Sequence, residues 1–154
     1  MKFEVNAAGN SRPKILLVNR AILENEVGEI LLIQRSTKDT YMPGKWEFPG
    51  GKLDLGLDIS GALEREVLEE TGLNMVIKDQ IAYWTSKLLT TGKYEGFLYV
   101  ELVGRGTSLG SEVILSEEHD AFAWVKKENV LTYDLVDVSK ESFKMLYLSN
   151  DTRS

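Results

Sequence analysis

The sequence contains no cysteine, a single histidine and only three prolines among its 154 residues. Without cysteine the chain forms no disulfide and performs no thiolate chemistry. With His119 as the one imidazole, a zinc centre is not expected. The chain also lacks a long apolar run and a basic leader followed by an apolar stretch, which together predict a cytoplasmic protein that does not associate with membranes.

Positive charge is scarce, because the 18 Lys and Arg residues are outnumbered by 24 Asp and Glu residues, which gives a net charge of −6. Binding to nucleic acid or to an anionic membrane relies on clustered Lys and Arg, so neither partner is expected. An acidic chain is better suited to meeting a small anionic substrate through metal ions. The length and the 43% hydrophobic content predict one globular domain over residues 1–154, present as a monomer or a homodimer.

Two apolar runs that flank a turn predict a pair of hairpin strands, followed by a helix, further strands and a final helix. Polar and glycine-rich stretches at residues 36–45 and 104–116 are interpreted as loops, and residues 1–12 as poorly ordered or as an edge strand. This order predicts an α/β fold with a mixed sheet flanked by helices. The predicted strands cover residues 14–23, 29–35, 74–89 and 94–103 with a short strand ending at Val125, and the helices cover residues 58–72 and 139–149.

The first predicted helix carries three carboxylates on one face. Glu66, Glu69 and Glu70 stand at positions i, i+3 and i+4, so all three project within one turn and repel one another. Such a cluster indicates a neutralising cation, and oxygen donors favour Mg²⁺ or Mn²⁺. The alternative is an ordinary solvated glutamate-rich face. Asp58 is placed to cap the start of the helix and Gly72 its end.

The surrounding residues strengthen the functional interpretation. Gly50 and Gly51 follow Phe48-Pro49 a short loop before the helix, where a backbone without side chains can approach a phosphate closely. Arg65 adds a planar cation beside the carboxylates. This combination of glycines, cation and carboxylates predicts a site for a phosphorylated substrate.

Residues 51–73 resemble the Nudix box, G-x5-E-x7-R-E-U-x-E-E-x-G-U, in which U is aliphatic. Every fixed position matches except one, since Leu57 stands where the family has its first glutamate. Residues 46–52, WEFPGGK, are similar to the segment that precedes the box in the MutT-like branch. A spacing match of this length is a far stronger signal than a lone glycine motif. The matching residues are Gly51, Arg65-Glu66, Val67, Glu69-Glu70 and Gly72-Leu73.

The resemblance implies a Nudix α/β/α sandwich that hydrolyses a phosphoanhydride of a nucleoside diphosphate derivative with Mg²⁺ or Mn²⁺. It implies that Glu66 is also the carboxylate nearest the attacking water, and that Arg65 orients a carboxylate. An ordinary i,i+4 pair with Glu69 is the alternative role for Arg65. The implied metal ligands are Glu66, Glu69, Glu70 and Gly50, and the implied phosphate-binding residues are Gly51, Lys52 and Arg35.

A distal acidic residue completes the catalytic set that the resemblance implies. Glu118 and His119, followed by Trp124, are similar to the distal acidic site of several Nudix hydrolases, which makes Glu118 the candidate general base. Glu117 is the rival, and a solvated acidic loop is the alternative to both. His119 is expected to shape this loop rather than to do chemistry.

The MutT-like segment favours a nucleoside triphosphate, cut to a nucleoside monophosphate and pyrophosphate. Leu88 and Leu89 occupy the region where ADP-ribose hydrolases often carry a proline, and Thr90 stands where dinucleoside polyphosphate hydrolases tend to have tyrosine. ADP-ribose and nucleotide sugars remain alternative substrates. Leu57 leaves a further alternative open, a catalytically silent domain that senses a nucleotide.

Overall fold

The computed structural model of the chain describes residues 4–53, 56 and 58–148, so Leu57 lies outside the described residues. Seven of the described strands form one sheet in the order β5-β4-β3-β8-β7, with β6 paired to β3 and β9 paired to β4. The strands are β3 (Ile15–Glu24), β4 (Ile30–Arg35), β5 (Trp46–Glu47), β6 (Gly50–Lys52), β7 (Asn74–Leu88), β8 (Leu98–Leu109) and β9 (His119–Val125).

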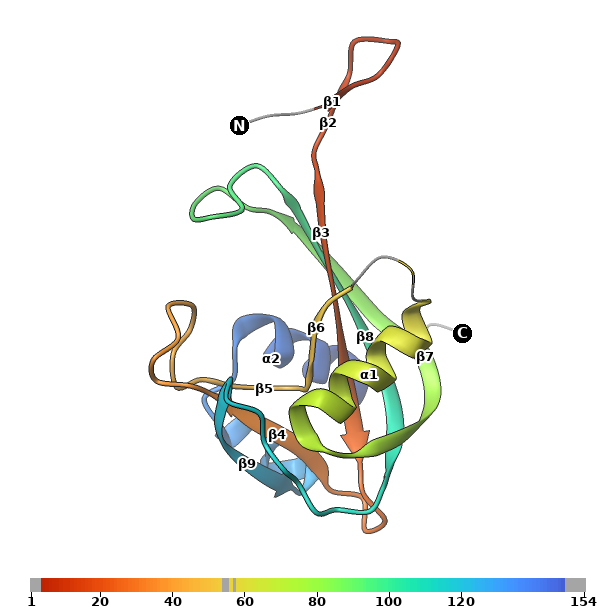
Figure 1. Ribbon diagram of the computed structural model, residues 1–154, viewed down its shortest axis with the longest axis vertical. Coiled ribbons are helices and arrows are strands. Elements are labelled where there is room, and N and C mark those ends of the chain that lie inside the picture. The colour runs from red at the N-terminus through yellow and green to blue at the C-terminus, as the bar shows by residue number, and fades with distance from the viewer. Residues whose placement is uncertain (1–3, 54–55, 57, 149–154) are drawn as a thin grey trace.

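Two helices accompany the sheet, α1 (Ile59–Thr71) and α2 (Asp137–Phe143). A 3-10 turn, η1 (Lys127–Thr132), precedes α2, and a π-helical turn, η2 (Lys144–Leu148), extends it. Near the amino terminus β1 (Glu4–Val5) and β2 (Ser11–Arg12) pair with each other rather than with the main sheet. Their hairpin stands clear of the rest of the fold in Figure 1.

Alternate residues of the central strands enter two separate cores. Leu23 and Leu31 pack with Leu63 of α1 on one face of the sheet, whereas Ile22 and Leu32 pack with α2 on the other. Since successive side chains of a strand point to opposite faces, the continuous apolar runs of β3 and β4 reflect burial on both sides. The predicted α/β/α sandwich is therefore confirmed.

The sheet is mixed, as predicted, but its pairing differs from the expected hairpin of the first two long strands. β3 runs parallel to β8 from the Ile15↔Leu98 pair to the Glu24↔Thr107 pair. It meets β4 only at Glu24↔Ile30, and β4 pairs over most of its length with β9. A parallel pair needs a long crossover, so short-range sequence patterns do not reveal it.

The predicted loop over residues 104–116 is wrong at its start, because β8 continues to Leu109. The glycines that suggested a loop mark close packing instead. A Cβ at Gly104 would lie 2.8 Å from the carbonyl oxygen of Gln80 and 2.9 Å from Leu63 Cδ2. A Cβ at Gly106 would lie 2.5 Å from the carbonyl oxygen of Val76. The glycines therefore let β8 pack tightly beside β7 and against α1.

Both predicted caps of α1 are confirmed. Asp58 Oδ1 accepts the backbone N–H of Gly61 at 2.6 Å. Gly72 adopts the left-handed conformation with φ 71° and donates its N–H to the Leu68 carbonyl oxygen. These contacts fix where the helix begins and ends, and they therefore fix which residues its last two turns present to β6 and β9.

We expect Asp58→Ala to lower the free energy of unfolding by about 1 kcal/mol, because the Gly61 N–H loses its acceptor. Asp58→Asn keeps an acceptor oxygen and should lose much less. Urea denaturation followed by circular dichroism measures both variants. Equal losses would show that the acceptor oxygen at position 58 is not the source of the stabilisation.

Candidate functional site

The glycine pair of β6 lies directly against the carboxylates of α1. The Gly50 N–H donates to Glu70 Oε1 at 2.9 Å. A Cβ at Gly51 would stand 2.8 Å from Glu66 Oε2, and one at Gly50 would stand 2.1 Å from the Asn19 carbonyl oxygen. Gly50 also has φ +152°, a conformation that other residues rarely adopt. The two glycines thus let the chain pass between β3 and the helix.

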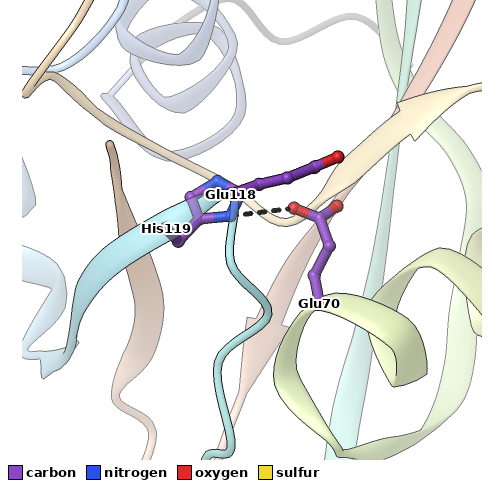
Figure 2. Close-up of side chains that lie close together, drawn as sticks. All are labelled: Glu70, Glu118 and His119. Atoms are coloured by element: carbon purple, nitrogen blue, oxygen red, sulfur yellow. Dashed lines mark ion pairs between the residues drawn. The ribbon is translucent and has the colours of Figure 1, made fainter. Parts of the chain in front are cut away.

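Glu70 of α1 meets Glu118 and His119, which lie just before and at the start of β9 (Figure 2). One ligand atom from each residue lies within 4.8 Å of the other two. Glu70 and His119 are buried, whereas Glu118 is exposed. Glu117 is also exposed but does not belong to this group.

The other predicted metal ligands differ in burial. Glu66 is partly buried against Gly51, but the Glu69 side chain is 59% exposed and lies outside the group formed with His119. Arg65 Nε lies 3.5 Å from Glu69 Oε1, which is the i,i+4 pair that the sequence offered as an alternative role for this arginine. This contact is an ion pair between two partly exposed side chains, so by itself it does not assign Arg65 a catalytic role.

A buried network of ion pairs adjoins the site. Its central members, Arg20 and Glu101, were not identified from the sequence. Arg20 Nη1 lies 3.5 Å from Glu47 Oε1, and Arg20 Nε donates to Glu101 Oε1 at 3.1 Å. Glu47 Oε2 lies 2.9 Å from His119 Nε2. The available signal was the presence of charged residues inside strongly apolar strands, which are almost never buried without a partner.

The contacts of Arg35 differ from those expected of a phosphate ligand. Its Nη1 donates to both oxygens of Glu47 at 3.2 Å, and its Nη2 donates to Asp39 at 2.6 Å. Its Nε donates to the Tyr41 carbonyl oxygen. Lys52, by contrast, is exposed, and its ammonium donates to the Tyr94 hydroxyl at 2.5 Å. Of these two predicted phosphate ligands, only Lys52 extends into solvent.

Burial and charge move the pKa values of the two central carboxyls in opposite directions. Burial acts to raise the pKa of Glu47, but Arg20, the His119 hydrogen bond and Arg35 outweigh it and lower the value to about 2. Burial raises the pKa of Glu70 to about 8, with Glu47 and Glu66 adding to the rise, although Arg20 and the Gly50 N–H oppose it.

This electrostatic arrangement fits a divalent cation. Glu66 and Glu70 flank the same glycine pair, and their like charges hinder full ionisation of Glu70. A cation among the carboxylates would remove that penalty, and oxygen ligands suit Mg²⁺ and Mn²⁺. The residues present therefore have the chemistry that a hard divalent ion requires.

Comparison with known proteins agrees with this geometry. The NUDIX domain model matches residues 15–146, which include all seven strands of the main sheet and both α-helices. The chain therefore belongs to the Nudix family and is a Nudix hydrolase. Its relatives place it more narrowly in the MutT-like branch. Among the described residues, no helix has the length and apolar character that crossing a membrane requires.

Three relatives illustrate the similarity. Nucleoside triphosphatase NudI from Escherichia coli O139:H28 is 29% identical over 130 residues, covering 80% of this chain and 91% of that protein. The MutT protein from Methanosarcina mazei Go1 is 33% identical with a TM-score of 0.71, covering 85% of this chain and 91% of that one. The E. coli ORF135 protein is 25% identical with a TM-score of 0.68, covering 88% and 90%.

We expect the metal-free protein to become less stable as the pH rises from about 5 to 8. The folded-state pKa of Glu70 is raised from 4.5 to about 8, so its stabilising proton is fully bound below 4.5 and lost as the pH passes 8. The slope should approach about 1.4 kcal/mol per pH unit at most. Glu70→Gln should flatten it, as measured by urea denaturation in chelator, and unchanged slopes in the variant would contradict the assignment.

Arg20→Met should lower the free energy of unfolding by about 3–5 kcal/mol, because it leaves buried carboxylates without their cation. Arg105→Met is the matched control on β8, since the Arg105 ion pair with Asp79 is 30% and 39% exposed. The control should cost about 1 kcal/mol or less. Denaturant unfolding measures both variants. Equal losses of unfolding free energy in Arg20→Met and Arg105→Met would contradict the importance assigned to Arg20.

Proposed function

We propose that the chain hydrolyses nucleoside triphosphates to a nucleoside monophosphate and pyrophosphate, using Mg²⁺ or Mn²⁺. The observation that carries this proposal is the convergence of Glu66 and Glu70 on the glycine pair of β6, with Glu118, just before β9, close to Glu70. Supporting it, the NudI relative is described as a nucleoside triphosphatase. The WEFPGGK segment before the box agrees with the same substrate class.

Four residues would hold the metal in this proposal, namely Glu66, Glu69, Glu70 and Gly50. The ion would neutralise phosphate charge and lower the pKa of its bound water. The Gly50 N–H orients Glu70 by fixing its Oε1, which leaves Oε2 facing the group formed with Glu118 and His119.

The remaining catalytic roles follow from exposure. Glu118 is the exposed carboxylate of the group, so we assign it to take the proton from the attacking water. Glu66, partly buried beside Gly51, is the second carboxylate near the water, and Arg65 holds Glu69 in place. Proton transfer thus uses the solvent-facing side of the site, where the proton can leave.

The phosphates would meet the backbone of Gly51 and the exposed ammonium of Lys52. A side chain at Gly51 would occupy the space beside Glu66, so only glycine leaves the backbone accessible there. Arg35 was expected to join them, but its described donors reach Glu47, Asp39 and Tyr41. We therefore assign Arg35 to positioning Glu47.

Product analysis tests the substrate. Purified protein is incubated with nucleoside triphosphates, ADP-ribose and nucleotide sugars, with Mg²⁺ or with chelator, and both fragments are identified by chromatography. Metal-dependent pyrophosphate and monophosphate from triphosphates are expected. Two monophosphates from ADP-ribose would assign the other substrate class. A folded protein that releases no product would favour the silent sensor that Leu57 suggested, and Leu57→Glu should then raise activity.

Glu70→Gln and Glu118→Gln should each lower kcat by at least about a hundredfold, since each removes a charge or a proton acceptor from the reaction. Glu64→Gln is the matched control, because Glu64 is an exposed glutamate of the same helix outside the group. Steady-state kinetics measures turnover, and circular dichroism checks that each variant folds. A fully active Glu70→Gln enzyme would refute the proposal.

A further inference from the structure

His119 is the one histidine of the chain, and its imidazole is held between two carboxylates. The side chain is 3% exposed. Nε2 lies 2.9 Å from Glu47 Oε2, whereas Nδ1 lies 3.4 Å from Glu70 Oε2. Nδ1 is buried and has no hydrogen-bond partner among the described residues. Figure 2 shows the ring directed at the Glu70 carboxylate, with Glu118 beside it.

The surroundings of Glu47 determine which ring nitrogen carries the proton. Arg20 and Arg35 both place guanidinium nitrogens within 3.5 Å of this carboxylate, which keeps it ionised. An ionised carboxylate only accepts hydrogen bonds, so His119 Nε2 must donate. In the neutral ring Nδ1 then presents a lone pair toward Glu70 and Glu118.

A buried Nδ1 without a partner is costly, and a cation held between it and the oxygens of Glu70 and Glu118 would satisfy it. The same arrangement, in which a carboxylate fixes one ring nitrogen while the other faces a metal, orients histidine ligands in metalloproteins. The alternative is an imidazolium that pairs with both Glu47 and Glu70. Against it, the 3.4 Å contact between His119 Nδ1 and Glu70 Oε2 does not form a hydrogen bond.

We propose that His119 Nδ1, together with Glu70 and Glu118, binds a first-row transition ion such as Mn²⁺, with Glu47 as the positioning residue that fixes the imidazole. The three candidate ligand atoms lie within 4.8 Å of one another, so one ion can contact all three. A nitrogen ligand favours transition ions over Mg²⁺, which prefers oxygen. The inference deepens the proposed function and rests on it for the role of Glu70.

Pulsed electron paramagnetic resonance of the full chain with Mn²⁺ alone tests the nitrogen ligand. The expected spectrum shows coupling of Mn²⁺ to an imidazole ¹⁴N nucleus. Labelling the protein with ¹⁵N-histidine should convert that pattern to the ¹⁵N pattern. The assignment is unambiguous because only one residue carries the label. This measurement needs no variant, so it remains decisive even where a substitution prevents folding.

Substitution of His119 measures how much this residue contributes to Mn²⁺ affinity. His119→Gln should weaken Mn²⁺ binding by about ten- to a hundredfold and change Mg²⁺ binding much less, because it removes a nitrogen ligand. Glu117→Gln, an exposed neighbour outside the group, is the matched control and should bind both ions as the wild type does. The free Mn²⁺ signal measures binding, and competition with Mg²⁺ gives the second affinity.

Two results would overturn this inference. Mn²⁺ bound without imidazole coupling would mean that His119 only pairs with the carboxylates. Equal losses of Mn²⁺ and Mg²⁺ affinity in His119→Gln would assign it a purely structural role. Either result leaves the proposed hydrolysis standing if the wild type still releases pyrophosphate with metal, so the two failures are distinguishable. If the wild type showed no metal-dependent turnover at all, the proposed function would be refuted instead.

Discussion

The Arg20 guanidinium is linked to the acidic site through Glu47, and the arrangement of the carboxylates there depends on this largely buried cation. It contacts Glu47 and Glu101 directly, and its charge helps to lower the pKa of Glu47 and opposes the rise in the pKa of Glu70. Burying charged groups costs several kcal/mol per ion before their attraction is counted. A hydrophobic cluster in the same place would cost less, so this network is better explained by function than by stability.

The order of elements and the helix that carries the glutamates could be predicted from the sequence, because both depend on local patterns. The caps Asp58 and Gly72 act within a few residues of the chain, and they lie where predicted. The Nudix resemblance rests on spacing within one continuous segment. Local chemistry of this kind is visible in a sequence because distant partners do not alter it.

The buried network was not predictable in the same way. Arg20 and Glu101 are 81 positions apart and meet only because β3 lies parallel to β8. The burial of His119 likewise depends on the pairing of β9 with β4, since the sequence alone placed it in an acidic loop. Gly104 and Gly106 led to the wrong loop prediction for a related reason. Composition does not distinguish a flexible segment from a tightly packed one.

The parallel pairing of β3 with β8 has a consequence for how the protein folds. The two strands are separated by about half of the chain, so the central sheet forms only after a costly loop closure, which slows folding. On the ribosome, β3 and β4 are synthesised before either of their main partners exists. The edges of these apolar strands therefore stay unpaired until the residues up to Val125 have been translated. During this interval the nascent chain is most prone to aggregation.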